Sequence, residues 1–355
     1  MKRHILLVTI DTLRADHLGC YGAEAVRTPF FDAFAASGAR FGFHLSSLAT
    51  TLPSHTSLLT GCTPAMHCVT WNGISVPRRR RTLAEITAEA GYSTTAITSW
   101  GGFQHQQVLG FENSYSQSGA GADDNRGDHT LQRVLRWLER ADRNTPQLLW
   151  VHFIDPHAPN NCPEPFPQTY QGEVEFVDTL LGELMHKWDE KLGVEQSTAV
   201  ITADHGEHLN DHGVERGHGT LWLTNLHIPM AIRAPGLIEA GGVVPELTRQ
   251  IDVLPTILDY SALPMPYNIE GTSLRGLIEG SDRELHLTHS GQILREDNRK
   301  LTLRNGRYSM HFADNGSLTH MFDLNEDPGE EDDLWSGSSN SGYSVQHSIR
   351  DSRER

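Results

Sequence analysis

The chain has 355 residues, of which 37% are hydrophobic, and its formal net charge is -16. This length can bury one large core together with a small satellite domain. The acidic balance argues against nucleic acid as a partner, because a phosphate backbone is bound by a basic surface. No stretch approaches the roughly 20 apolar residues that cross a bilayer, so we expect no membrane partner.

The N-terminus and the cysteines indicate a cytoplasmic protein. The first apolar run stops at Thr9 and Asp11, which is too short for the core of a signal peptide and favours a buried strand. The four cysteines contain no CxxC pair and no dense framework. This usage fits a reducing compartment, although an isolated disulfide is compatible with it.

Apolar strand-like runs alternate with amphipathic helical stretches. In chain order, we predict strand 5–10, helices 29–37, 51–60 and 82–90, strand 93–98, helix 128–141, strand 147–154, helix 173–192, strands 197–202 and 228–233, and helix 252–260. Strand–helix repetition is typical of a parallel sheet that is covered on both faces.

The C-terminal part of the chain has a different pattern. Short strand-like runs between residues 301 and 324 are separated by Asn305-Gly306 and Asn315-Gly316, and Asn-Gly is a strong hairpin signal. We therefore predict a catalytic α/β domain at 1–290 and a small antiparallel subdomain at 291–335. Residues 336–355 are rich in serine, glycine and charge, and we expect a disordered tail there.

Three predicted strands end in an acidic residue, namely Asp11, Asp155 and Asp204. In open α/β sheets, ligands bind at the carboxyl ends of strands. Taken alone, Asp11 is better explained as a helix cap. Asp204 with His205 is a stronger signal, because adjacent oxygen and nitrogen ligands suit zinc, manganese or magnesium better than calcium.

Thr51 begins a predicted helix, where the backbone N–H groups create a positive field. A threonine hydroxyl is a poor nucleophile unless a base or a metal activates it, and in isolation Thr51 is better explained as a simple cap. His157 and His218 lie on loops rich in glycine or proline, where bound groups are often presented. For either histidine, an ordinary loop position is the alternative.

Taken together, these segments resemble the sulfatase family of the alkaline phosphatase superfamily. The matching stretches are DTLRADHLGCYG at 11–22, LPSHTSLLTG at 52–61, FIDPHAP at 153–159, TADHGE at 202–207, the IP…R.PG pattern at 228–236, DVLPTILD at 252–259 and MFDLNEDPGEEDDL at 321–334. The resemblance implies an α/β fold with a central mixed sheet between helices and a small C-terminal antiparallel sheet. It also implies a divalent cation (Zn, Mn, Mg or Ca) held by Asp11, Asp204, His205 and the Thr51 oxygen.

Several positions depart from the family pattern. Sulfatases carry Cys or Ser, followed by x-Pro-x-Arg, and convert the first residue to formylglycine, whereas this chain has Thr51 and His55. Thr12 replaces the second aspartate of the usual pair, and the expected lysines are missing. A threonine nucleophile resembles the phosphodiesterases and phosphotransferases of the superfamily. There, two further histidines help bind a second zinc or the phosphoryl group, which implies this role for His157 and His218.

We therefore predict metal-dependent hydrolysis of a small anionic phosphodiester or phosphomonoester through a covalent Thr51 intermediate. His55, His157 and His218 are expected to assist catalysis. One metal site is expected, and His157 with His218 could form a second. Further substrate contacts are assigned to His55, Asn72, His105 and His212, although an ordinary surface position is favoured for the last three.

Three alternatives to phosphate-ester hydrolysis stay open. The first is a sulfuric ester hydrolase of the arylsulfatase kind, with Thr51 acting directly. The second is a phosphoryl-group transferase. The third is a non-catalytic protein that keeps the metal site.

Overall fold

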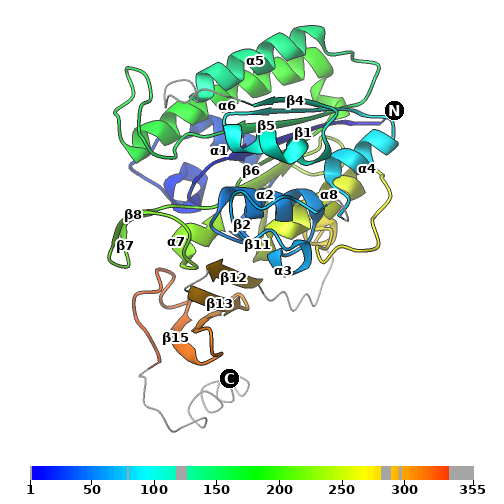
Figure 1. Cartoon of the computed structure of the whole chain (residues 1–355). Coiled ribbons are helices and arrows are strands. Elements are labelled where there is room, and N and C mark those ends of the chain that lie inside the picture. The colour runs from blue at the N-terminus through cyan, green and yellow to red at the C-terminus, as the bar shows by residue number, and fades with distance from the viewer. Residues whose placement is uncertain (1, 78–79, 117–125, 281–288, 296–297, 336–355) are drawn as a thin grey trace.

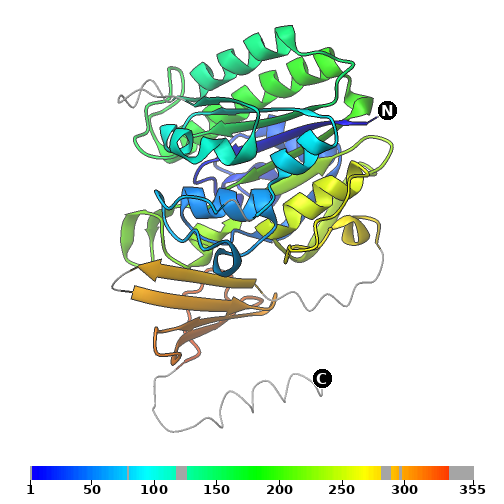
Figure 2. The ribbon, with the colours of Figure 1, turned by 45° about the vertical axis from the view of Figure 1, so that its right-hand side comes forward.

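The structure is a computed structural model, and it describes residues 2–77, 80–116, 126–280, 289–295 and 298–335. The tail at 336–355, for which disorder was expected, lies outside the described residues. Figure 1 shows a helix-covered sheet that contains most of the chain, with a smaller sheet formed by its C-terminal part. Figure 2 shows the strands of this smaller sheet beside one another.

The central sheet is mixed, as the resemblance implies. Its strands are β1 (His4–Ile10), β2 (Ala39–Leu45), β3 (Ser93–Thr98), β4 (Asn113–Ser116), β5 (Gln147–Phe153), β6 (Ser197–Ala203), β9 (His227–Ile228), β10 (Met230–Arg233) and β11 (Gly242–Arg249). Their order is β11-β2-β10-β6-β1-β5-β3-β4, and β9 pairs with β2. Because β10 is antiparallel to β6 and β2, the wholly parallel sheet expected from strand–helix alternation is wrong here.

Two layers of helices cover this sheet. The α-helices are α1 (Pro29–Ala36), α2 (Thr51–Thr60), α3 (Pro64–His67), α4 (Leu83–Glu89), α5 (Gly127–Arg140), α6 (Tyr170–Leu192), α7 (Leu223–Leu226), α8 (Val253–Tyr260) and α9 (Arg275–Ile278). Short 3-10 helices are η1 (Ala15–His17), η2 (Gly19–Tyr21), η3 (Gly101–Gly110), η5 (Val194–Gln196) and η6 (Gln250–Asp252). Helices α1, α5 and α6 pack on one face, whereas α2, α4 and α8 pack on the other (Figure 1).

Strand β1 lies at the centre of the sheet, between β5 and β6, and all seven of its residues are buried. Its side chains alternate between the two faces, as the pleat requires. Leu6, Val8 and Ile10 belong to the core under α1, α5 and α6. Ile5 and Leu7 belong to the core under α2, α4 and α8. A central strand buried on both faces explains the continuous apolar run at the start of the chain.

The C-terminal sheet consists of β12 (His289–Arg295), β13 (Asn298–Arg304), β14 (Tyr308–Phe312) and β15 (Leu318–Asp323), all antiparallel. The Asn-Gly dipeptides lie in the β13–β14 and β14–β15 connections, as expected, with Gly306 at φ 87 and Gly316 at φ 79. A separate hairpin is formed by β7 (His208–Asp211) and β8 (Val214–Gly217). The proposed division of the chain at residue 290 stays a prediction.

All four cysteines are free. Among the described residues, no helix combines the length and the apolar character that crossing a membrane requires.

Candidate active site and metal centre

The side chains on one face of the sheet change from apolar to polar toward the carboxyl ends of the strands. On β1, Thr9 continues the side of Ile5 and Leu7, and Asp11 follows just beyond the strand. In the register of the sheet, Thr9 lies beside His152 of β5 and Thr202 of β6. Asp204 follows β6, so two aspartates from distant segments reach one edge, as strand ends in a parallel arrangement must.

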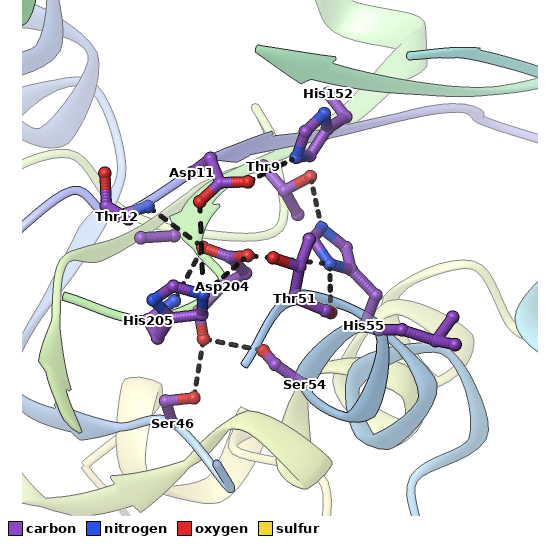
Figure 3. A network of polar contacts seen from close by, with 12 residues as sticks. Thr9, Asp11, Thr12, Ser46, Thr51, Ser54, His55, His152, Asp204 and His205 are labelled. Atoms are coloured by element: carbon purple, nitrogen blue, oxygen red, sulfur yellow. Dashed lines mark hydrogen bonds and ion pairs between the residues drawn. The ribbon is translucent and has the colours of Figure 1, made fainter. Parts of the chain in front are cut away.

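Asp204 is held by both its side chain and its backbone. Its Oδ1 accepts hydrogen bonds from the backbone N–H of Thr12 at 3.1 Å and of His205 at 2.7 Å. Its carbonyl oxygen accepts from the hydroxyls of Ser46 and Ser54 at 2.5 and 2.6 Å. Ser54 belongs to α2, so this contact fixes the start of that helix against the strand end (Figure 3).

His205 presents an imidazole that is ready to bind a cation. Its Nδ1 lies 3.0 Å from the carbonyl oxygen of Gly206, so Nδ1 carries the proton and Nε2 keeps its lone pair. Burial, together with the neighbouring His218, lowers the pKa of His205 to about 3. The Nε2 atom lies 3.4 Å from Asp204 Oδ2 and 3.9 Å from Asp11 Oδ1.

These three side chains fit a divalent cation. Asp11 Oδ1, Asp204 Oδ2 and His205 Nε2 are buried and have no hydrogen-bond partner, yet they face one another. Burial and the charge of Asp11 raise the pKa of Asp204 well above its usual value. Two buried carboxylates without a counter-charge resist ionising together, and a cation removes this conflict.

Thr51 is the first residue of α2, and its side chain is buried beside this cluster. The residue is 5% exposed, and Thr50 before it has an extended backbone. The Nδ1 atom of His55 lies 2.7 Å from the Thr51 carbonyl oxygen and 3.8 Å from Asp204 Oδ2. The helix start that carries Thr51 therefore lies next to the Asp204 carboxylate (Figure 3).

The partners of His55 determine its tautomer. The Thr51 carbonyl can only accept, so His55 Nδ1 carries the proton and donates it. Trp150 Nε1 donates to Thr9 Oγ1 at 2.9 Å, which leaves the Thr9 hydroxyl to donate to His55 Nε2 at 2.9 Å. Burial lowers the pKa of His55 well below its usual value, which favours this neutral ring. Both ring nitrogens are thus engaged within the protein, and the roles of His55 in catalysis and substrate contact stay predictions.

His157 and His218 lie on the other side of His205. The ring centroid of His218 is 4.5 Å from that of His205 and 5.4 Å from that of His157. His218 Nδ1 lies 3.2 Å from the carbonyl oxygen of Ala49, two residues before Thr51. Both rings are partly exposed, so the structure brings these two predicted histidines to the solvent side of the cluster.

The remaining sequence-predicted contacts lie in different places. Asn72 Oδ1 accepts from the backbone N–H of Leu52 at 2.9 Å, so it caps α2 next to Thr51. His212 stacks on Trp222 with ring centroids 4.0 Å apart, in an aromatic group that continues into the C-terminal sheet. The side chain of His105 lies outside the described residues.

His152 is a residue that the sequence analysis missed. It lies within the apolar run of β5, it is fully buried, and neither ring nitrogen has a hydrogen-bond partner. The signal that could have identified it is the alternation along β5. Leu148 and Trp150 face the α2 side of the sheet, and His152 continues that face toward Asp11.

Comparison with known families decides the assignment. The family model described as Sulfatase matches residues 3–262. The chain belongs to the sulfatase family. A second model, described as N-sulphoglucosamine sulphohydrolase, C-terminal, matches residues 220–352 of this sulfatase-family chain.

Curated relatives of this sulfatase-family chain include several sulfatases. It is 22% identical to an arylsulfatase of Clostridium perfringens, over 93% of the chain and 89% of the relative. It is 26% identical to human arylsulfatase A, over 94% and 83%. It is 25% identical to a Formosa agariphila ulvan-active sulfatase, over 80% of the chain and 66% of that relative.

Solved structures share the whole fold of the sulfatase-family chain. A phosphonate monoester hydrolase of Agrobacterium radiobacter matches with a TM-score of 0.85 and 20% identity, covering 99% of this chain and 95% of that one. A protein solved with its substrate D-glucosamine-2-N,6-O-disulfate matches with a TM-score of 0.84 and 17% identity, covering 99% and 96%.

The comparisons establish a hydrolase that acts on sulfuric or phosphoric esters, and members of the family use a divalent metal ion. They support the sulfuric-ester alternative better than the phosphate-ester reading, because sulfatases predominate among the relatives.

Proposed function

We propose that this sulfatase-family protein hydrolyses a monoanionic ester, in the first instance a sulfate monoester, with Thr51 as the nucleophile. The observation that carries the proposal is the position of Thr51, at the start of α2 beside the buried Asp11, Asp204 and His205 cluster. The sulfatase relatives support the sulfate ester as substrate.

The charge of the site favours a monoanion. A divalent cation would be balanced by the two aspartates, and the buried imidazoles of His55 and His205 are neutral. Among the described residues, no lysine or arginine is paired with either aspartate, and the nearby Arg14 is held by Asp16 and Asp211. A phosphate monoester carries nearly two negative charges at neutral pH and would lack a matching counter-charge.

The residues of the chain then have distinct roles. Asp11, Asp204 and His205 would hold the cation, which supplies charge that lowers the pKa of the Thr51 hydroxyl and offsets charge on the ester oxygens. The α2 N-terminus adds backbone N–H groups aimed at the anion. His157 and His218 lie on the solvent side. Their Nδ1 atoms face the carbonyl oxygens of Ala158 at 2.6 Å and of Ala49 at 3.2 Å, so Nδ1 carries the proton in each ring and Nε2 is the nitrogen that can accept one.

The reaction proceeds in two displacements. Thr51 Oγ1 attacks the central sulfur, the bond to the leaving alcohol breaks, and His218 carries the proton from Thr51 to that alcohol. Water then attacks the sulfur, and the bond between sulfur and Thr51 Oγ1 breaks. The threonine hydroxyl regains a proton from this water, and sulfate leaves.

A second candidate is hydrolysis of a phosphodiester or a phosphonate monoester, which are also monoanions. The observation that favours it is Thr51 itself, because threonine cannot become formylglycine and must release its adduct by direct attack of water. Phosphorus is the usual centre for such in-line displacements. A solved phosphonate monoester hydrolase also shares this fold.

The experiment compares four esters of one leaving group, so that only the transferred group changes. Chelator-stripped protein reloaded with Mn²⁺ or Zn²⁺ is assayed with 4-nitrophenyl sulfate, 4-nitrophenyl phenylphosphonate, bis(4-nitrophenyl) phosphate and 4-nitrophenyl phosphate. We expect the highest kcat/KM for the sulfate, with the dianionic phosphate monoester at least tenfold lower than any monoanion that is turned over. Stripped protein without added metal is the control.

Each of the other possible results supports a different candidate function or contradicts the charge argument. The highest kcat/KM for the phosphonate or the diester selects the second candidate. A preference for 4-nitrophenyl phosphate contradicts the charge argument. Absence of turnover with metal bound, across all four esters, supports a non-catalytic metal-binding protein.

A further inference from the structure

His152 is a buried polar side chain that the roles described above leave unused. It is fully buried on β5, and both Nδ1 and Nε2 lack a hydrogen-bond partner. An unpaired polar group in the interior carries the full cost of its lost hydration. The rings of His55 and Phe103 pack against it at centroid distances of 5.1 and 5.3 Å, and neither forms a hydrogen bond with it.

The ring of His152 points at the aspartates. Its Nε2 lies 3.4 Å from Asp11 Oδ2, which is close enough for an ion pair, but the two atoms do not form a hydrogen bond. The ligand atoms of a tetrahedral cation with bonds of about 2.0–2.1 Å are about 3.3–3.4 Å apart. The separation between His205 Nε2 and Asp204 Oδ2 is also 3.4 Å. Each of these two nitrogen–oxygen pairs therefore has the spacing of two ligands of one ion. Asp11 faces His152 through Oδ2 and His205 through Oδ1, so its carboxylate lies between the two histidines.

Two sets of donor atoms lie close enough to share a cation, and Asp204 belongs to both. One set is Asp11, Asp204 and His205, and the other is His55, His152 and Asp204. In the second set, however, both ring nitrogens of His55 are engaged by Thr51 and Thr9. This leaves only His152 and Asp204 as available donors, too few for a separate ion.

We propose that His152 is a fourth protein ligand of the cation held by Asp11, Asp204 and His205. This inference rests on the proposed function, because it concerns the same metal centre. The centre then has two carboxylates and two imidazoles, and zinc with four such ligands can expand to five-coordination to take the oxygen of Thr51 or of the ester. Thr12 supplies no carboxylate to this centre. Because imidazole suits zinc better than calcium, the site should select Zn²⁺ over Ca²⁺.

The direct test is His152→Cys, loaded with Co²⁺ as a coloured substitute for zinc. A thiolate bound to cobalt produces an intense sulfur-to-cobalt charge-transfer band, and an unbound thiol produces none. We expect this band in the variant and not in the wild-type protein, whose four native cysteines provide the baseline. Circular dichroism checks that the variant is folded, and this readout needs no turnover.

A second variant, His152→Ala, measures the contribution of the ring. We expect Zn²⁺ affinity, measured by calorimetry on stripped protein, to fall more than about 100-fold, beyond the 10–100-fold typical of a residue that only orients a ligand. His44→Ala is the matched control, because His44 is also fully buried in the central sheet but bonds to Thr248. Its Zn²⁺ affinity should stay within about threefold of wild type.

The outcomes separate this inference from the proposed function. If wild-type protein binds no divalent metal, the proposed function itself fails. If it binds metal, but His152→Cys shows no charge-transfer band and His152→Ala lowers zinc affinity by less than about 100-fold, only the role of His152 as a ligand is overturned. Binding of two ions, of which His152→Ala abolishes one and leaves the other with wild-type affinity, would also overturn the single shared centre.

Discussion

His55 shows how one side chain can fix the position of a nucleophile. Its ring joins the Thr51 carbonyl oxygen to the hydroxyl of Thr9, and Thr9 is held in turn by Trp150. The ring therefore sets the first turn of α2 relative to β1. Positioning of this kind matters for rate, because misplacing a reacting group by 1 Å can cost about 100-fold.

We expect His55→Ala to lower kcat about 10- to 100-fold, with little change in KM or in bound metal, because the nucleophile loses its alignment. His55→Asn should recover part of this loss, since its amide N–H can take the position of Nδ1 and donate to Thr51. The measurement is steady-state kinetics on the best ester of the panel. A rise in KM with unchanged kcat would instead assign His55 to substrate contact.

At the residue scale, the sequence predicts the motif residues but not the buried side chains that surround them. Asp11, Asp204 and His205 follow strands, and Thr51 starts a helix, so local pattern and resemblance both identify them. His152 is hidden because a histidine inside an apolar strand is more often a satisfied core residue.

At the scale of elements, the segment after α2 contains a histidine that must stay neutral. His67, at the end of α3, accepts from the backbone N–H of Val69 through Nδ1 at 3.0 Å. Its Nε2 lies 2.9 Å from the hydroxyl of Ser57 in α2 and must donate to it. Burial lowers the pKa of His67 to about 3.

This arrangement predicts loss of stability in acid. Below a pH of about 6.5 the unfolded chain takes up a proton at His67 while the folded chain does not, so unfolding becomes easier as pH falls toward 3. The group contributes up to about 1.4 kcal/mol per pH unit. Urea unfolding between pH 7 and pH 4 should show this slope, and His67→Asn, which keeps an acceptor for Val69, should reduce it. An unchanged slope in the variant would contradict this account.

The elements themselves were predicted unevenly, for physical reasons. Buried strands with continuous apolar runs, such as β1 and β5, are recognisable from sequence, and their predicted bounds differ from the structure by a single residue. The predicted strand at 228–233 is divided at Pro229 into β9 and β10. β2 was missed although Ala39, Phe41 and Leu45 alternate with polar residues. β11 was missed because Pro245 interrupts its pattern, where the pairing with β2 shifts register.

At the scale of the whole molecule, a buried ion pair joins the C-terminal sheet to the active-site segment. Arg304 of β13 contacts Glu330 at 2.7 Å, and both side chains are fully buried. Arg304 also donates to the Leu221 carbonyl oxygen at 2.6 Å, and Glu330 accepts from the Leu223 backbone N–H at 2.8 Å. The segment that follows His218 is therefore tied to the smaller sheet.

We expect Glu330→Ala to lower the free energy of unfolding by about 3–5 kcal/mol, because it leaves Arg304 buried and unpaired. The matched control is Glu331→Ala at the exposed neighbouring position, which should change it by less than about 0.5 kcal/mol. Urea denaturation of both variants measures the difference. Equal, small effects would show that the two sheets are joined by other contacts.

The central claim is that Thr51 performs the attack at a cation held by Asp11, Asp204 and His205. The most direct test is the turnover of metal-loaded Thr51→Ala on the best ester, with metal content and melting temperature measured on the same sample. We expect kcat to fall at least about 1,000-fold while the protein stays folded and retains its metal. A metal-loaded alanine variant that works within tenfold of wild type would contradict the account.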